Sequence, residues 1–189
     1  MTLLPLVDPK NMEPDIRQTM ETYQNWVGDT VYAQFMANVP DIFRKFNEFY
    51  MTVLGGRVES ETKELARLRL SRLNGCLYCQ SANVVWARNN NIPERKLAEI
   101  DHWWDSDAFS VREKAIFTLA DRFAFNAPSE RLDDRTLAML REHFSDAEIL
   151  ELACFFAFVI GYQRMNAVFD VQYGCPLPEA SGAKELAAK

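Results

Sequence analysis

The sequence predicts an all-α protein. Along most of the chain, apolar residues recur at three- and four-residue spacing, which is the pattern of helices with one buried face. No segment shows the convincing alternation of a half-buried strand. The 189 residues are 48% hydrophobic and include only 7 Gly and 8 Pro, a globular composition that excludes collagen-like and broadly disordered chains.

Three prolines mark expected helix starts. Pro14, Pro40 and Pro93 suit the first turn of a helix, because proline lacks only an amide donor that would be unpaired there. They predict helices over residues 14–27, 40–54 and 93–105.

Two capping boxes mark further starts. Ser110 with Glu113, and Ser145 with Glu148, have the spacing in which a hydroxyl and a carboxylate bind the free amides of a first turn. They predict helices over 110–125 and 145–171, the first of which carries a clear apolar stripe.

Turn residues separate the remaining elements. These joints are Gly55-Gly56, Asn74-Gly75, Asn89-Asn90-Asn91 and Ala127-Pro128-Ser129. The other expected helices are 29–37, 59–73, 76–89 and 133–142. None of the joints is long enough for a domain linker, so we expect one domain over 1–189, with a small polar tail at 180–189 that is disordered.

Charge and hydropathy exclude several classes of partner. Twenty-seven acidic and 21 basic side chains give a net charge of -6, which argues against nucleic-acid binding. The longest apolar run, 152–162, is much shorter than the roughly 20 residues of a membrane-spanning helix. The first seven residues lack the basic start of a secretion signal, so we expect a cytoplasmic protein with no membrane partner.

The strongest chemical signal is a C-x-x-C pair, Cys76 and Cys79, directly after a helix stop. If a helix begins at Gly75 or Cys76, residues three apart share a face, so the two sulfurs can form a disulfide. The first-turn amides would also lower the pKa of a thiol placed there and increase its reactive thiolate fraction. The pair therefore predicts dithiol redox chemistry.

Two other interpretations of the pair remain. A structural zinc site needs four ligands, but Cys154 and Cys175 lie far apart in sequence, and His102 and His143 are the only histidines. We therefore expect neither a metal nor another cofactor. Inert packing is the stronger competitor, because free cysteine is among the most buried residue types.

The sequence resembles a known family, the alkyl hydroperoxidase D-like (AhpD-like), or carboxymuconolactone decarboxylase-like, proteins. The similarity rests on the order and spacing of residues 64–70, 73–79, 87–97, 110–115 and 143–148, and covers about residues 40–170. The resemblance implies an AhpD-like helical fold and assembly into dimers, trimers or hexamers. For members with the C-x-x-C pair it also implies thiol-dependent reduction of a small hydroperoxide, with a dithiol or a lipoyl protein as reductant.

The resemblance also implies roles for individual residues. Cys79 would attack the peroxide, and Cys76 would resolve the resulting sulfenic acid as a disulfide. Glu64 stands at the position of the family's glutamate, twelve residues before the first cysteine, and would accept the proton. Asn83 stands where the family has a histidine, and because a carboxamide does not titrate, it could only orient a water or a thiolate.

Purely structural roles are alternatives for several of these residues. Glu64 could be an exposed helix carboxylate paired with Arg67, and Tyr78 could be a packing residue. The many Phe and Trp side chains are expected in the core or in subunit contacts more than in a substrate cleft. Arg69, Arg72 and Arg88 are expected to be solvated. The alternative function is a non-catalytic oligomeric scaffold, ligand-binding protein or redox sensor, and lactone chemistry is a third possibility.

Overall fold

The computed structural model describes residues 2–125 and 131–174, and within these ranges it contains helices and no strand, which confirms the predicted all-α fold. The turn expected at 127–129, the tail expected at 180–189 and Cys175 lie outside them. The elements are η1 (Pro9–Asn11), α1 (Pro14–Val27), α2 (Val31–Met36), α3 (Pro40–Leu54), α4 (Ser60–Leu73), α5 (Leu77–Asn89), α6 (Glu94–Glu99), η2 (Ile100–His102), α7 (Val111–Phe125), α8 (Asp134–Arg141) and α9 (Asp146–Val168).

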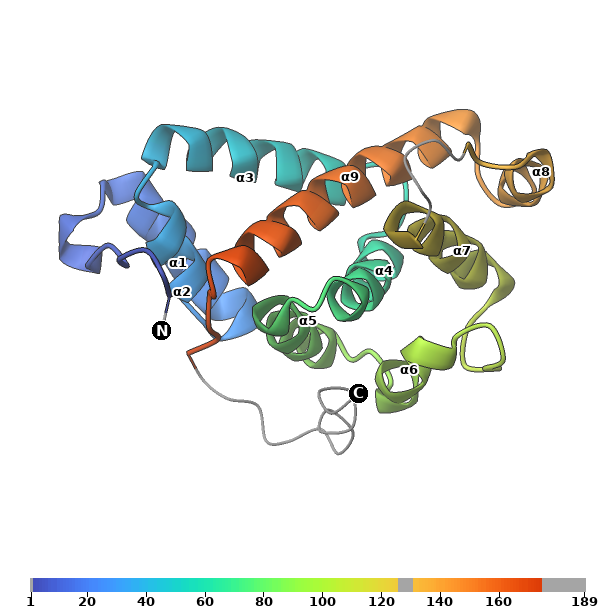
Figure 1. Ribbon diagram of the computed structural model, residues 1–189, viewed down its shortest axis with the longest axis horizontal. Helices are drawn as coiled ribbons and strands as arrows, with labels where there is room; N and C mark the ends of the chain where they lie inside the picture. Colours follow the sequence, from blue (N-terminus) through green and yellow to red (C-terminus); the bar gives the residue numbers. More distant parts are fainter. Residues whose placement is uncertain (1, 126–130, 175–189) are drawn as a thin grey trace.

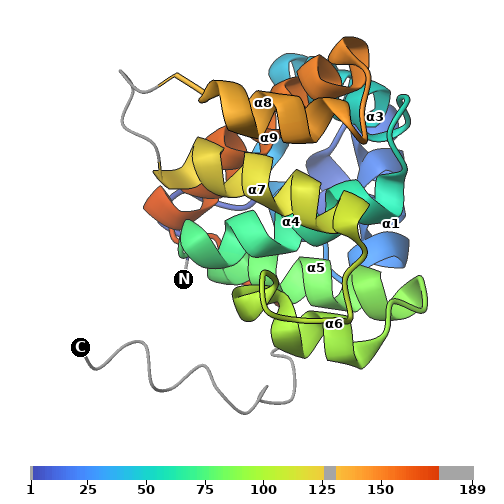
Figure 2. The same cartoon turned by 90° about the vertical axis from the view of Figure 1, so that its right-hand side faces the viewer.

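Helix α4 is the centre of the fold. It packs against α5, α7 and α9, and in Figure 2 it lies between α7 and α5. Every residue from Lys63 to Ser71 is buried, although four of them carry a charge. Long helix α9 crosses α4 and also packs on α3 (Figure 1), so α4 and α9 together carry much of the core.

The buried charges of α4 have partners on other elements. Lys63, which is fully buried, donates to Glu151 of α9 at 2.7 Å and to the carbonyl oxygens of Val53 and Leu54. Arg69 pairs with Asp121 of α7 and with Asp101 of η2. Because burying a charge without a partner is costly, these ion pairs are what allows a charged sequence to occupy the centre.

The expected helix starts are largely confirmed. Pro14 and Pro40 open α1 and α3, whereas Pro93 is the residue just before α6. Ser145 forms a capping box with Glu148. Ser110 and Glu113 bind each other's backbone amides in the same way before α7.

Two expected helices are shorter in the structure. The helix expected over 93–105 ends at Glu99 and continues only as the 3-10 turn η2, where Asp101 pairs with Arg69 and Arg72. The helix expected over 145–171 ends at Val168, because Asp170 has a left-handed φ of 52° and the Val171 amide donates back to the Asn166 carbonyl. The short turn η1 was not expected.

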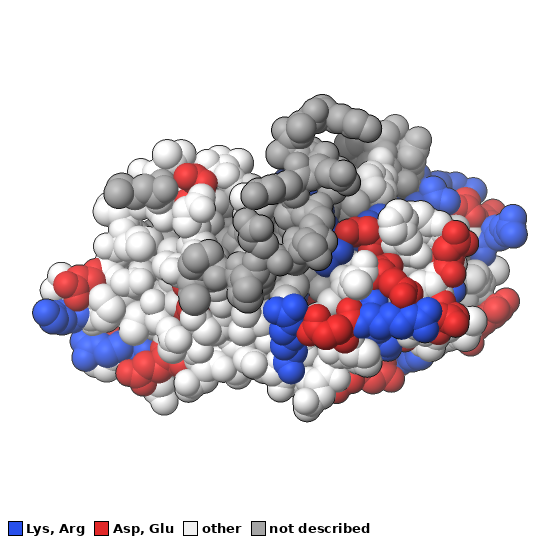
Figure 3. All heavy atoms as spheres, turned by 90° about the horizontal axis from the view of Figure 1, so that it is seen from below, with Lys and Arg blue, Asp and Glu red and all other residues white. Residues whose placement is uncertain are grey.

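Charge is unevenly distributed over the surface. Seen from below, charged side chains gather over the side that carries α6, where Figure 3 shows acidic and basic groups alternating. Ion pairs made by residues of α6 include Arg88 with Glu94 and Arg95 with Asp107. Among the described residues, no helix combines the length and the apolar character that crossing a bilayer requires. Self-association and a cytoplasmic location stay predictions.

Candidate functional site

The cysteine pair lies at the turn between α4 and α5. Helix α4 ends in a Schellman motif, in which Gly75 has a φ of 66° and the Cys76 amide donates to the Ser71 carbonyl at 3.0 Å. Glycine adopts this left-handed conformation without a steric penalty. Cys76 is then the N-cap of α5, one residue earlier than the first helical residue, Leu77. A local turn signal in the sequence thus sets the position of both sulfurs.

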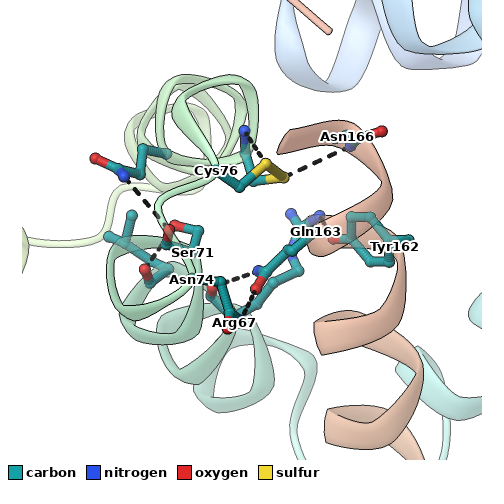
Figure 4. The surroundings of a disulfide bond; sticks show 10 residues. Arg67, Ser71, Asn74, Cys76, Tyr162, Gln163 and Asn166 are labelled. Atoms are coloured by element: carbon teal, nitrogen blue, oxygen red, sulfur yellow. Dashed lines mark hydrogen bonds between the residues drawn. A yellow bond between two sulfur atoms is a disulfide. The ribbon is translucent and has the colours of Figure 1, made fainter. Parts of the chain in front are cut away.

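Cys76 and Cys79 form a disulfide. Both residues are buried, with exposed fractions of 0% and 2%. The Cys76 sulfur accepts a hydrogen bond from the Cys79 backbone amide at 3.2 Å, so the start of α5 favours negative charge on Cys76. The Cys79 sulfur instead faces the Asn166 side-chain amide, 3.6 Å away on α9 (Figure 4).

A cavity of about 40 Å³ lies beside Cys79, which is space for a few water molecules. It is enclosed by α1, α2, α3, α4, α5 and α9, and Cys79 lines it whereas Cys76 does not. The lining residues are Tyr23, Val27, Tyr32, Phe46, Tyr50, Arg67, Tyr78, Cys79, Ala82, Asn83, Phe158, Tyr162 and Asn166.

Helical spacing explains which residues of α5 and α9 reach the cavity. Cys79 and Asn83 are four residues apart on α5, and Phe158, Tyr162 and Asn166 follow one another at four-residue spacing on α9. Gln163, the neighbour of Tyr162, donates to the Arg67 carbonyl and accepts from Asn74 (Figure 4). This bridge fixes α9 against the turn that holds the cysteines.

Glu64 lies one layer behind the cavity wall. Its carboxylate accepts a hydrogen bond from the Tyr50 hydroxyl at 2.9 Å and pairs with Arg67, and these two partners line the cavity while Glu64 does not. Arg67 also donates to the Tyr162 hydroxyl at 3.1 Å. Burial raises the pKa of Glu64, against the opposing effects of Arg67 and of the Tyr50 hydrogen bond. The expected pairing with Arg67 is present, but Glu64 is buried and not exposed.

Two amide side chains flank Cys79 without full hydrogen bonding. Asn83 is 2% exposed, and within the described part of the chain neither its Nδ2 nor its Oδ1 has a partner. The Oδ1 of Asn166, 1% exposed, also lacks a partner there. A buried polar group without a partner costs about 1–3 kcal/mol. These amide atoms therefore favour binding of a polar ligand in the cavity, because the ligand can form hydrogen bonds with them.

The other ionisable groups of the wall hold their protons strongly. Burial raises the pKa values of Tyr32, Tyr50 and Tyr78 well above that of an exposed tyrosine, and the nearby Asp29 carboxylate adds to the effect on Tyr78. Burial lowers the pKa of Arg67, but Glu64, Tyr162 and Tyr50 together outweigh it and raise this pKa well above its ordinary value. These tyrosines and Arg67 therefore keep their protons throughout the physiological pH range.

The remaining sequence candidates lie away from the cysteines. Arg69 is buried, which corrects the expectation that it would be solvated, and its partners are aspartates. Arg72 pairs with Asp101. His102 is exposed, and His143 follows the end of α8. None of these side chains lines the cavity.

Several side chains that line the cavity were not predicted from the sequence as part of the site. Tyr50, Tyr162 and Asn166 were not proposed at all, and Arg67 was considered only as an exposed partner of Glu64. The four-residue spacing of Tyr162 and Asn166 is visible in the sequence, but only the fold places that face of α9 over Cys79. Among the described residues, no three His, Cys, Asp or Glu side chains are grouped as metal ligands.

Known proteins are similar to this chain in sequence and in fold. Residues 40–122 match the carboxymuconolactone decarboxylase family, a segment that contains Glu64, Cys76, Cys79 and Asn83 but not α9. The uncharacterised protein YdfG of Bacillus subtilis is 26% identical over 109 residues, which cover 58% of this chain and 74% of YdfG.

Solved structures share the fold over most of the chain. The AhpD core of a peroxidase-related protein from Ralstonia eutropha JMP134 has a TM-score of 0.78 at 22% identity, and the alignment covers 91% of this chain and 92% of that one. A cysteine-to-alanine variant of the debrominase Bmp8, in complex with 2,3,4-tribromopyrrole, has a TM-score of 0.77 at 19% identity, with 92% of both chains covered. The fold of this chain is thus AhpD-like, and its residues 40–122 are similar to the carboxymuconolactone decarboxylase family.

Proposed function

We propose that the protein is a dithiol oxidoreductase that reduces an organic hydroperoxide at Cys79. The observation that carries the proposal is that Cys79, and not Cys76, lines a buried cavity in which two incompletely bonded amides flank the sulfur. Such a cavity can hold the peroxide group of a substrate against the sulfur. The similarity of residues 40–122 to the carboxymuconolactone decarboxylase family and the cysteine pair are both compatible with this redox role.

The proposed reaction has two steps. The Cys79 thiolate attacks the terminal oxygen of ROOH, the O–O bond breaks, and the products are the Cys79 sulfenic acid and, after protonation, the alcohol ROH. The Cys76 thiolate then attacks the Cys79 sulfur, the disulfide forms as the S–O bond breaks, and the departing hydroxide takes up a proton to become water. The amide that donates to the Cys76 sulfur favours its thiolate for this step. An external dithiol, for which a lipoyl protein is one candidate, reduces the disulfide again.

Glu64 can take the thiol proton only through an intermediary, because it does not line the cavity. We propose that Tyr50 is this intermediary, since its hydroxyl reaches the cavity and donates to Glu64. A proton delivered to the Tyr50 oxygen by a cavity water would be matched by transfer of the Tyr50 proton to Glu64. Asn83 would orient that water.

The test is steady-state consumption of cumene hydroperoxide with dithiothreitol. Cys79→Ser should abolish turnover, whereas Cys154→Ser should retain it, because Cys154 is an exposed free cysteine outside the cavity. Cys76→Ser, reduced and then desalted to remove dithiothreitol, should consume one equivalent and accumulate a Cys79 sulfenic acid that dimedone traps. Turnover that survives Cys79→Ser would refute the proposal. Stoichiometric oxidation of the wild type without turnover would favour a redox sensor.

Reductive dehalogenation of an aromatic ring is a second candidate. The cavity wall contains five tyrosines and two phenylalanines, and the debrominase Bmp8, which binds 2,3,4-tribromopyrrole, shares this fold. Two thiols can reduce an aryl bromide to the arene, with formation of one disulfide and release of HBr. Release of bromide from 2,3,4-tribromopyrrole in the presence of dithiothreitol, lost in Cys79→Ser, would support this reaction; no release would exclude this substrate.

A further inference from the structure

A surface groove is lined by residues of α3 and α9. The two helices diverge towards the N-terminus of α3 (Figure 1). The groove measures about 510 Å³ and is lined by Asp41, Ile42, Lys45, Phe46, Phe49 and Phe158. Five of these residues share one face of α3. Ile42 is 56% exposed and Phe49 is 44% exposed, and large apolar side chains that face solvent together indicate a binding surface.

The groove and the Cys79 cavity share two residues. Phe46 and Phe158 line both spaces, each is half-buried, and their ring centroids are 4.3 Å apart. One side of this ring pair therefore faces the groove, and the other faces the cavity. Phenylalanine makes no hydrogen bond that would fix its orientation. Only packing contacts therefore oppose the rotation of either ring.

We propose that the groove binds the apolar body of the substrate and that Phe46 and Phe158 control its access to Cys79. This inference rests on the proposed function and specifies its substrate class. The ligand has a small neutral polar head, which fits the cavity of about 40 Å³ between the two amides, and an alkyl or aryl body that remains in the groove. Hydrogen peroxide has no such body and gains nothing from the groove.

Because the groove adjoins the Cys79 cavity, the substrate is the occupant that fits the groove best. The groove ends at the ring pair, and behind the rings lie the amide atoms of Asn83 and Asn166 that lack partners in the described part of the chain. A ligand that spans both spaces would satisfy the amides and cover Ile42 and Phe49 together. A second copy of the chain seated on α3 would cover only the apolar surface and leave the amides unsatisfied.

The first experiment measures access to Cys79 without any turnover. Protein reduced with dithiothreitol and then desalted is treated with iodoacetamide, and alkylation of each cysteine is followed by peptide mass spectrometry. Phe158→Ala should speed alkylation of Cys79 by about tenfold or more, because the missing ring opens the wall between the two spaces. Alkylation of the exposed Cys154 in the same sample is the internal reference.

Two further variants keep this experiment decisive. Phe158→Trp should slow alkylation of Cys79, and it provides the test if Phe158→Ala fails to fold. Phe123→Ala removes a ring of α7 that packs on Phe156 and lines neither space, so Cys79 should react as in the wild type. If both Phe158 variants leave the Cys79 rate within twofold of the wild type, the ring pair does not control access.

The second experiment tests the substrate class. The ratio of kcat/KM for cumene hydroperoxide to that for hydrogen peroxide should exceed about ten in the wild type and fall at least threefold in Ile42→Ser, because the groove then binds the aryl body less well. Phe123→Ala should keep the wild-type ratio. An unchanged ratio in Ile42→Ser would overturn the proposed role of the groove.

A binding measurement separates failure of this inference from failure of the peroxidase proposal. The alcohol 2-phenyl-2-propanol has the shape of the reduced substrate and does not oxidise thiols. It should protect Cys79 from iodoacetamide in the wild type and protect it less in Ile42→Ser, even if the protein turns over no peroxide. If there is no protection, and light scattering shows that Ile42→Ser dissociates an oligomer, the groove is a contact between copies and the inference is wrong.

Discussion

Replacing Glu151 by glutamine should destabilise the protein at neutral pH and have a much smaller effect in acid. Glu151 lies on α9, and its carboxylate accepts hydrogen bonds from the backbone amides of Arg57 and Val58 and from Lys63 of central helix α4. Lys63 is fully buried. The carboxylate thus ties three segments of the chain together and balances a buried charge.

The magnitude follows from the pKa of Glu151. The hydrogen bonds and the ion pair outweigh burial and lower this pKa from 4.5 to about 2. A tenfold change in proton affinity corresponds to about 1.4 kcal/mol, so the fold favours the charged carboxylate by about 3 kcal/mol. Because the pKa is lowered on folding, this stabilisation is present above pH 5 and is lost as the pH falls towards 2.

Urea unfolding of the wild type and Glu151→Gln at pH 7 and pH 3 measures this contribution. The free energy of unfolding should differ by about 3 kcal/mol at pH 7 and by less than half of that at pH 3. Glu61→Gln, at an exposed position at the start of α4, is the matched control and should change the free energy by less than about 0.5 kcal/mol. An equal difference between wild type and Glu151→Gln at both pH values would refute the reasoning, because the effect would then not depend on the charge.

Three further predictions concern the site and its turn. Gly75→Ala should lower Tm by about 2–4 °C, because alanine is strained at a φ of 66°, although its Cβ would meet no atom within 4 Å. Gly161→Ala, within α9, should instead raise Tm in the same thermal scan. Asn83→His should increase peroxide turnover by about tenfold or more if a titratable group beside Cys79 speeds proton transfer, and Asn83→Gln, which does not titrate, should not. Tyr50→Phe should lower turnover by about 100-fold and match Glu64→Gln if the proton passes through the Tyr50 hydroxyl; a loss in Glu64→Gln alone would show that it does not.

Helix ends could be predicted from the sequence because they depend on neighbouring residues. The capping box of Ser145 and Glu148 and the left-handed Gly75 each involve hydrogen bonds that span only a few residues. The same locality explains why the cysteine pair was placed correctly at a helix start. The early end of α6 was missed because distant ion pairs hold Asp101 in the η2 turn.

The burial of α4 could not be predicted in the same way. Its sequence, with charges at Lys63, Glu64, Arg67 and Arg69, has the composition of a solvated helix. Yet Lys63 pairs with a residue 88 positions away, and Arg69 pairs with one 52 positions away. Such distant partners leave no periodic signal in the sequence, so the central helix of the fold was indistinguishable from a surface helix.

In the candidate site, too, residues close together in sequence could be predicted and residues far apart could not. Cys76, Cys79 and Asn83 could be proposed together because they lie within eight positions, whereas Asn166 reaches the Cys79 sulfur from 87 positions away. The family resemblance assigned Glu64 to the site but could not reveal that Tyr50 and Arg67 stand between its carboxylate and the cavity. Short sequence motifs thus identify the reactive sulfurs, whereas the residues that surround them can be identified only from the three-dimensional fold.

The groups that line the cavity around Cys79 determine which of them can exchange a proton in the proposed reaction. Burial keeps the cavity's tyrosines protonated, the raised pKa of Arg67 keeps it charged, and Asn83 and Asn166 do not titrate. The groups left to exchange a proton near neutral pH are Cys79 itself and, through Tyr50, Glu64. Both act in their deprotonated forms, so the chemistry should accelerate as the pH rises and show no decline before the tyrosines or Arg67 titrate. A histidine at position 83 would add a second titrating group to the pH dependence of turnover. The asparagine at this position therefore changes which groups can accept a proton in the site.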